Sequence, residues 1–198
     1  MLHLLFSIYL KMLVLYSPFF VLSCFIGLSR GYSPKEQKRL AWRVALGVLV
    51  ASVLLYLFGR VIFSVFGITV DAFRIGAGSV LFISALAMAQ GKSAVQTDNV
   101  QQDVTIVPLT IPLTVGPGTI GALLVMGVSQ PHWDDKLVAI LAIALASFTV
   151  GLVLYLANSI ERLLGDQGLQ IVSRLMGLFV CALAAQIIFT GIKGYLLP

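Results

Sequence analysis

The sequence predicts an all-α polytopic membrane protein with six transmembrane helices. They are expected to form two inverted three-helix repeats, with helices one and four broken. Three observations lead to this prediction. Of the 198 residues, 59% are hydrophobic and only 11% are charged, against about 25% charged residues in a typical soluble domain. The apolar residues form long runs rather than the short alternating segments of a β-barrel. Prolines interrupt two of these runs.

The composition excludes several other classes of protein. Mean hydropathy is +1.02, and the 21 charged residues cannot cover the surface of a soluble domain of this length. Disorder, a coiled coil and a disulfide scaffold are excluded on the same grounds. The net charge of +5 does not indicate a nucleic-acid partner, because five basic residues gather in one short connection between apolar segments. These five are Arg30, Lys35, Lys38, Arg39 and Arg43. The expected partner is the lipid bilayer.

Six apolar segments are long enough to span a membrane, which takes about 20 residues. The predicted spans are 2–28, 41–66, 72–90, 104–129, 137–160 and 175–192. Their connections are short, so residues 1–198 form a single membrane domain. An alternative for the first segment is a signal peptide, since Val21-Leu22-Ser23-Cys24 resembles a lipobox. We expect a retained helix.

The distribution of lysine and arginine predicts the orientation. With the amino terminus outside, eight basic residues lie inside and four outside, while Lys11 falls within the first span. The positive-inside rule therefore favours a multi-pass membrane protein with both termini in the periplasm or the exterior.

The chain matches itself weakly when it is shifted by 99 or 100 residues. Pro18 falls on Pro117, Leu55-Tyr56-Leu57 on Leu154-Tyr155-Leu156, and Arg74 on Arg174. The matches keep their order along all three pairs of segments, which indicates a repeat of 1–98 in 99–198. Three spans per half would insert the second half upside down, as in many secondary transporters. Composition alone is the alternative explanation.

The fourth segment contains prolines at 108, 112 and 117, which cannot share one regular helix. It should form two half-helices with an unwound middle that lines a cavity. Gly116-Pro117 is typical of a helix start, and the glycines would let a ligand approach the backbone. The backbone amides that we expect to point freely into the gap, where they favour an anion, are those of Gly118, Thr119 and Ile120.

The first segment repeats this pattern at Ser17-Pro18, where Ser17 is a natural N-cap and Pro18 a natural first-turn residue. Inverted topology would aim both half-helix starts at one central region. The alternative is that both prolines only kink their helices and shape the packing.

The polar residues narrow the class of ligand. No Asp or Glu lies inside a predicted span, so a proton relay and a cationic substrate lack support. A small zwitterion fits better, with its carboxylate on the half-helix amides and its ammonium, or a coupling Na⁺, on the carbonyls around 110–115. The predicted substrate-binding residues are Ser17, Pro18, Thr110, Thr114, Gly116, Pro117, Gly118, Thr119 and Gln186.

Other charged residues have structural explanations. Arg74 and Arg174 begin the third and sixth segments as interface anchors, or as gates that pair with acids in the loops. Lys11 is expected to extend to an interface rather than to act in catalysis. No nucleophile–base pair, metal-ligand spacing or phosphate loop is present, so we expect neither an enzyme nor a metal or other cofactor beyond a candidate Na⁺.

At these residues the chain resembles the MarC family of six-span bacterial and archaeal inner-membrane proteins, also called the neutral amino-acid transporter family. The likeness covers nearly the whole length. Its motifs are Phe73-Arg74-Ile75-Gly76-Ala77-Gly78, followed by Leu81-Phe82 and Met88; Val107-Pro108-Leu109, Pro112 and Gly116-Pro117-Gly118; and Arg174-Leu175-Met176-Gly177 with Gln186 and Gly191-Ile192. The resemblance implies transport of small neutral amino acids such as glycine or alanine.

The chain departs from the family pattern in its first segment. The family usually carries Asn-Pro-x-Gly-x-x-Pro there, and this chain has Ser17-Pro18-Phe19-Phe20-Val21-Leu22-Ser23. Phe20 would crowd a ligand near the backbone. A membrane scaffold that kept the fold without transporting is therefore the alternative function, and a channel would need more polar residues in the spans. The substrate, coupling ion, direction and oligomeric state stay open.

Overall fold

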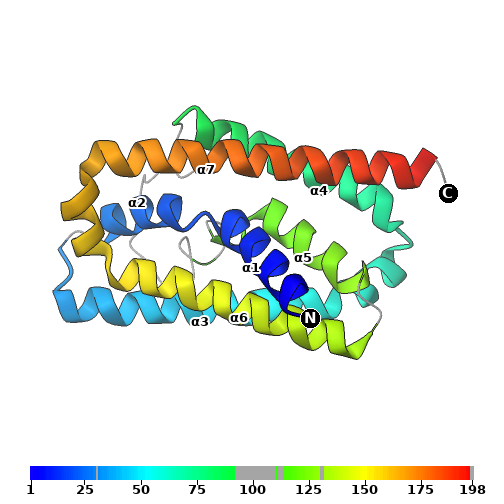
Figure 1. The fold of residues 1–198 in the computed structure, drawn as a ribbon, viewed down its shortest axis with the longest axis horizontal. Coiled ribbons are helices and arrows are strands. Elements are labelled where there is room, and N and C mark those ends of the chain that lie inside the picture. Colours follow the sequence, from blue (N-terminus) through cyan, green and yellow to red (C-terminus); the bar gives the residue numbers. More distant parts are fainter. Residues whose placement is uncertain (30, 92–109, 111–113, 130–131, 197–198) are drawn as a thin grey trace.

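The computed structural model describes residues 1–29, 31–91, 110, 114–129 and 132–196. Within these ranges every regular element is a helix and no strand occurs, as predicted. The helices are α1 (Leu2–Tyr16), α2 (Pro18–Leu28), α3 (Pro34–Phe66), α4 (Val70–Ala89), α5 (Pro117–Ser129), α6 (Trp133–Tyr155) and α7 (Ala157–Leu196). Helix α7 bends at Gly165, whose φ of 63° and ψ of 173° separate two helical stretches. The long helices lie lengthwise in one bundle (Figure 1).

Five helical stretches within the described residues are long and apolar enough to cross a membrane. They are Leu2–Leu28, Pro34–Gly59, Val70–Ala89, Trp133–Tyr155 and Gln167–Leu196. The predicted span 104–129 is covered in part by α5, whose 13 residues are too short to cross alone. Residues 104–109 and 111–113 of that span lie outside the described part of the chain. The chain is thus a multi-pass, all-helical membrane protein.

The predicted helix ends were less accurate than the predicted helices. Helix α3 begins at Pro34 rather than near 41, because Ser33 and Glu36 form a reciprocal capping box at its start. Helix α6 covers Trp133–Tyr155 instead of 137–160, and the last span extends over Gln167–Leu196 instead of 175–192. Hydropathy marks only the apolar part of a helix, whereas caps and polar turns decide where it ends.

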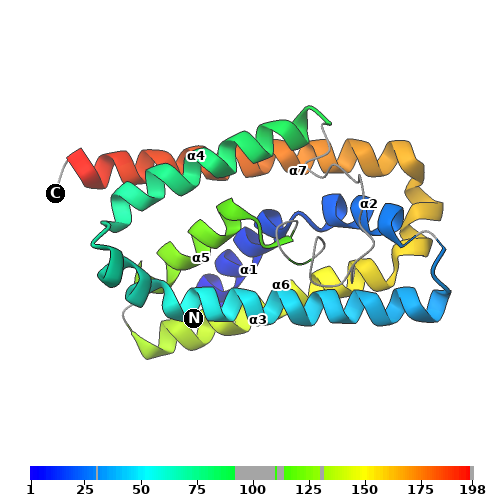
Figure 2. The same ribbon diagram turned by 180° about the vertical axis from the view of Figure 1, so that it is seen from behind.

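Helices α4 and α7 lie side by side and antiparallel, held together by small residues. Figures 1 and 2 show the pair from both sides. A Cβ added to Gly78 would stand 2.7 Å from Ile188 Cγ1 and 3.3 Å from the Ala184 carbonyl oxygen. A Cβ added to Gly177 would stand 2.6 Å from the Ala89 amide nitrogen. Glycine at these positions lets the two backbones approach each other, as is common between membrane helices.

The outer faces of α3 and α6 carry large apolar side chains at helical spacing. On α3 these exposed residues are Leu46, Val50, Leu54, Leu57, Val61 and Val65, and on α6 they are Leu137, Leu141, Leu145, Phe148 and Leu152. The opposite faces enclose a core with fully buried aromatic residues such as Tyr16, Phe25 and Tyr56. An apolar stripe facing outward on a well-packed bundle is typical of contact with lipid.

Candidate functional site

The first helix break lies at Ser17, between α1 and α2, as the sequence predicts. Ser17 has a left-handed backbone with φ of 47° and ψ of 61°, which is uncommon for any residue but glycine and asparagine. Its hydroxyl donates to the Val14 carbonyl at 2.9 Å, so the side chain closes the end of α1. Ser17 occupies the N-cap position of α2 as predicted, but its side chain makes no capping hydrogen bond to that helix. Pro18 begins α2 as its buried first residue, where its missing N–H costs nothing.

The second break precedes α5, which begins at Pro117 as predicted. The Val115 amide donates to the Thr110 carbonyl at 2.9 Å, and Thr110 and Thr114 are buried. The Ile120 amide donates to the Gly116 carbonyl at 2.9 Å, so it is not free for a ligand as we expected. The carbonyls considered for Na⁺ include those of 111–113, which lie outside the described residues.

The two breaks meet inside the bundle. The buried Thr119 hydroxyl, in the first turn of α5, lies 3.5 Å from the Leu15 carbonyl oxygen in the last turn of α1. A Cβ on Gly118 would collide with Leu81 of α4. The space that we expected beside Gly118 is therefore filled by α4, and this glycine serves close helix packing. Thr119 contacts Leu15, two residues before Ser17, so two site residues that were predicted from separate segments come close together.

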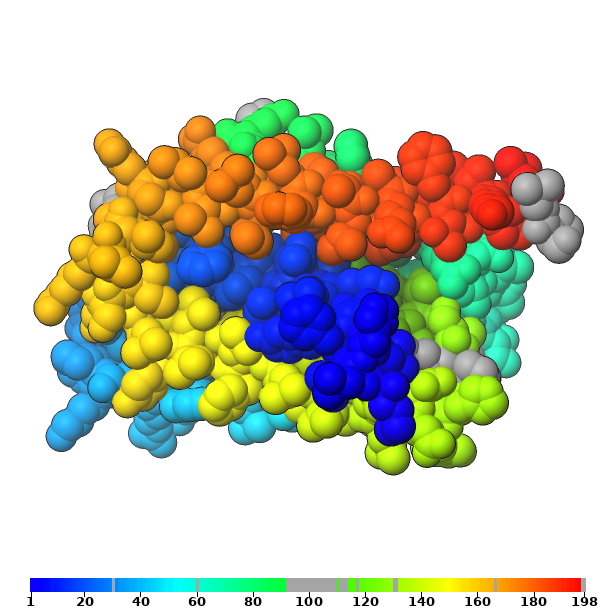
Figure 3. All heavy atoms as spheres, viewed as in Figure 1, coloured from blue at the N-terminus to red at the C-terminus, as the bar shows by residue number. Residues whose placement is uncertain are grey.

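A pocket of about 230 Å³ adjoins this meeting point. We call it the α1–α7 pocket. It is lined by Lys11, Met12 and Leu15 of α1, Arg74 of α4, Ala122, Val125 and Met126 of α5, and Leu183, Gln186, Ile187 and Thr190 of α7. Figure 3 shows this side of the molecule, with α1 in front, α7 above it and part of α5 deeper and to the right of α1. Leu15 connects the pocket to the breaks, since it lines the pocket and its carbonyl lies near Thr119.

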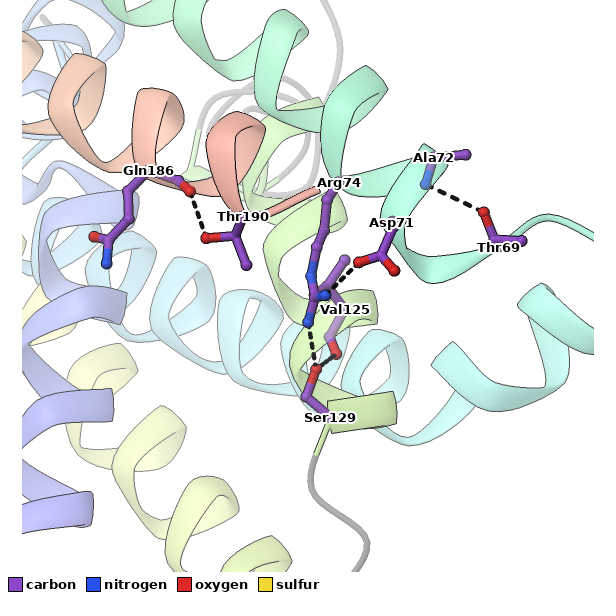
Figure 4. A network of polar contacts seen from close by, with 8 residues as sticks. All are labelled: Thr69, Asp71, Ala72, Arg74, Val125, Ser129, Gln186 and Thr190. Atoms are coloured by element: carbon purple, nitrogen blue, oxygen red, sulfur yellow. Dashed lines mark hydrogen bonds and ion pairs between the residues drawn. The ribbon is translucent and has the colours of Figure 1, made fainter. Parts of the chain in front are cut away.

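Polar contacts fix one end of the pocket (Figure 4). Arg74 Nη1 donates to Asp71 Oδ1 at 2.6 Å, and Nη2 donates to Ser129 Oγ at 3.1 Å. Arg74 thus pairs with an acid one turn earlier on its own helix, rather than with an acid in a loop. On α7, the Thr190 hydroxyl donates to the Gln186 carbonyl at 2.7 Å. The Gln186 side-chain amide extends from α7 away from Thr190.

Arg174 lies apart from the other predicted residues. Its guanidinium packs against Gly91, where an added Cβ would stand 2.6 Å from Nη2. Gly91 follows the carboxyl-terminal end of α4, whereas Arg74 belongs to the amino-terminal turns of the same helix. The two arginines therefore lie at opposite ends of the α4–α7 pair, and only Arg74 lines the pocket.

Two polar residues of the pocket, Lys11 and Thr190, were missed as site residues. Lys11 was expected to extend to an interface, and Thr190 was not considered. A lysine within an apolar segment, six residues before the break at Ser17, is the signal that could have identified Lys11. Thr190 follows Gln186 by one helical turn, which places both on one face of α7.

Comparisons with known proteins agree with this fold. The family model described as "MarC family integral membrane protein" matches residues 2–196. A UPF0056 membrane protein of Methanocaldococcus jannaschii is 34% identical over 188 residues, which cover 91% of this chain and 92% of the relative. A UPF0056 membrane protein of Pyrococcus horikoshii is 35% identical over 169 residues, covering 83% and 82%. The UPF0056 membrane protein YhcE of Escherichia coli is 27% identical over 197 residues, covering 96% and 92%.

These relatives carry no activity in their names, and no solved structure matches the chain significantly. The family assignment therefore depends on the sequence match, which covers almost all of the chain and all seven helices. It agrees with the resemblance carried by the arginine, proline and glycine motifs. The chain belongs to the MarC family of integral membrane proteins.

Proposed function

We propose that this protein is an inner-membrane secondary transporter of small neutral solutes, such as the amino acids glycine and alanine, that works by alternating access. The observation that carries the proposal is the meeting of two helix breaks at Thr119 and Leu15, beside a pocket with polar residues. Broken helices that meet inside a bundle expose backbone groups to a solute without exposing them to lipid. Pro18 and Pro117 favour these breaks locally.

Equivalent contacts in the two halves of the chain support an inverted repeat. Gly78 packs against Ala184 and Ile188, and Gly177 packs against Ala85 and Ala89. Three pairs of these residues are each 99 positions apart in the sequence: Gly78 and Gly177, Ala85 and Ala184, and Ala89 and Ile188. Any antiparallel pair of helices brings such positions together, so the support for a repeat is that glycine and alanine recur at the matched positions 78 and 177, and 85 and 184.

A second pair of equivalent contacts appears when the two halves of the sequence are compared with a shift of 100 positions. Gly91 packs against Arg174, and Gly191 packs against Arg74, with an added Cβ on Gly191 standing 2.9 Å from Arg74 Cβ. In an inverted repeat, the two halves exchange conformations when the transporter opens to the other side. The repeats would comprise 1–98 and 99–198, with both termini in the periplasm and six spans once 104–129 is counted.

The test is uptake of labelled L-alanine and glycine by liposomes that contain the purified protein, with and without a Na⁺ gradient. We expect saturable uptake above that of protein-free liposomes, and a dependence on Na⁺ would identify the coupling ion. Thr119→Val removes the hydroxyl that links the breaks and should lower uptake about fivefold, the effect of one ordinary hydrogen bond. Thr119→Ser keeps the hydroxyl and should retain most of the uptake.

A second candidate function is that of a non-transporting membrane scaffold. The altered first segment favours it, because Phe20 stands where the family pattern has glycine and lies close to the break at Ser17. Folded protein that neither takes up nor is stabilised by any of the twenty amino acids would favour this function and contradict transport.

A further inference from the structure

We propose that the α1–α7 pocket is a carboxylate site, at which Lys11 and Arg74 hold a small zwitterionic solute. This inference deepens the proposed function and relies on it only for the identity of the solute. The pocket combines two positive side chains, one amide and one hydroxyl with an apolar wall. Among the described residues that line it, none carries a carboxylate.

The charges around the pocket are unbalanced. In the described part of the chain, Arg74–Asp71 is the only salt bridge, so none of the acidic side chains described there lies within 4 Å of the Lys11 ammonium. Asp71 offsets one of the two cations and is not part of the pocket wall. Lys11 stands nine residues, or roughly 14 Å, along the span that begins at Leu2. A cation at such a depth is costly unless an anion or water accompanies it, and is most often functional.

Two hydrogen bonds position the Arg74 guanidinium and leave other N–H groups to bind an anion. Asp71 and Ser129 each take one of its N–H groups and fix the guanidinium at the edge of the pocket. A guanidinium carries five N–H donors, so others remain for a ligand. A carboxylate bound in the pocket would balance the charge of Lys11 and form charge-assisted hydrogen bonds with both cations.

The rest of the pocket suits a small amino acid better than a simple anion. The Gln186 amide oxygen is an acceptor for an ammonium group, and the side chain extends away from Thr190. Met12, Leu15 and Leu183 offer an apolar surface for a short side chain. A volume of about 230 Å³ is below the roughly 300–1,000 Å³ of sites for drug-sized ligands.

The first test uses three probes on the full-length protein in phosphatidylcholine nanodiscs. Propionate carries the carboxylate alone, L-alanine carries both charged groups, and L-alaninamide carries the ammonium alone. We expect L-alanine and propionate to raise the melting temperature and L-alaninamide to leave it unchanged. Stabilisation by L-alaninamide equal to that by L-alanine would overturn the proposal.

The second test locates the site. Lys11→Met keeps an unbranched side chain of similar length and removes a charge from a span. It should weaken propionate binding at least about tenfold, as expected for a charge-assisted hydrogen bond. Lys11→Arg should preserve binding. Lys136→Met is the matched control, because Lys136 lies over the Trp133 ring and outside the pocket. Unchanged propionate affinity in Lys11→Met would overturn the proposal.

A lipid phosphate could offer the same negative charge, and a third arm separates the two sources. If phosphatidylglycerol stabilises the protein through Lys11 while propionate has no effect in phosphatidylcholine, the pocket binds lipid and the proposal fails.

Failure of the transport proposal gives a different set of results. Propionate binding through Lys11 without uptake of any amino acid contradicts transport alone, whereas normal alanine uptake by Lys11→Met contradicts the carboxylate site alone.

Discussion

The α4–α7 pair and the α1–α5 junction differ in how their helices meet. Along α4 and the stretch of α7 that follows Gly165, glycines allow regular helices to touch backbone to backbone, as at Gly177 and Ala89. At the junction, neither helix continues: α1 ends at Tyr16, α5 begins at Pro117, and Thr119 reaches the Leu15 carbonyl across the gap. Small residues thus allow close packing of α4 against α7, whereas prolines interrupt the helices at the α1–α5 junction and hydroxyl groups make the contacts there.

The two regions have different expected roles, because the α4–α7 pair stabilises the fold and the α1–α5 junction adjoins the candidate binding pocket. A pair of helices without a gap has no place for a solute, and its close packing tolerates little change in volume. The junction keeps polar groups inside the bundle and adjoins the pocket with Lys11 and Arg74. Substitutions in the pair should therefore affect stability most, and substitutions at the junction should affect binding and uptake beyond their effect on stability.

The largest effect is expected for Gly177→Ala. Its Cβ would stand 2.6 Å from the Ala89 amide nitrogen, and backbone cannot move aside as a side-chain end can. Unfolding in detergent micelles should show a loss of roughly 2 kcal/mol. Gly76→Ala in α4 is the control, because nothing lies within 4 Å of its Cβ. This control should stabilise the protein by up to about 1 kcal/mol through helix propensity. Equal effects of the two substitutions would contradict close packing of α4 and α7.

A smaller effect is expected for Ser17→Ala at the junction. Alanine loses the hydroxyl bond to Val14 and keeps the left-handed backbone, so unfolding should become easier by about 1 kcal/mol. Ser17→Gly also loses the bond but relieves the backbone strain, and should recover most of that loss. Ser84→Ala removes a similar bond to the Val80 carbonyl on the exposed side of α4 and should change little. If Ser17→Gly proves less stable than Ser17→Ala, the backbone at residue 17 is not left-handed.

The smallest effect is expected for Asp71→Asn. The Asp71–Arg74 pair is partly exposed and spans one helical turn, so its loss should cost about 0.5 kcal/mol. Asp134→Asn is a matched control, because both acids lie in the first turn of a helix and share the effect of the helix dipole. The difference between the two variants should shrink in high salt. A difference independent of salt would show that the two charges contribute nothing.

The sequence predicted the positions of the helix breaks better than the contacts that the residues around them make. A proline within an apolar run breaks or kinks a helix through its own covalent geometry, so the positions of the breaks at 18 and 117 could be located without a structure. The roles of Gly118 and Ser17 could not, because each depends on a neighbour. Gly118 meets Leu81, which lies 37 residues earlier in the chain, and Ser17 turns its hydroxyl back to Val14.

The candidate site was predicted in part. Gln186 and Arg74 were singled out from different segments, and the pocket brings them together with the overlooked Lys11. Arg174 was singled out for the same reasons as Arg74 but packs at the opposite end of α4. Sequence alone could not separate the two arginines, because both stand at the start of an apolar segment near small residues.

By itself, the sequence determined that this protein is a helical, multi-pass membrane protein and where its helices break. Hydrophobicity, helix length and the covalent geometry of proline act locally and need no partner. The tertiary structure decided that the breaks meet at Thr119 and Leu15, that glycines join α4 to α7, and that Lys11 and Arg74 share one pocket. These features are contacts between distant segments, and packing in three dimensions selects them.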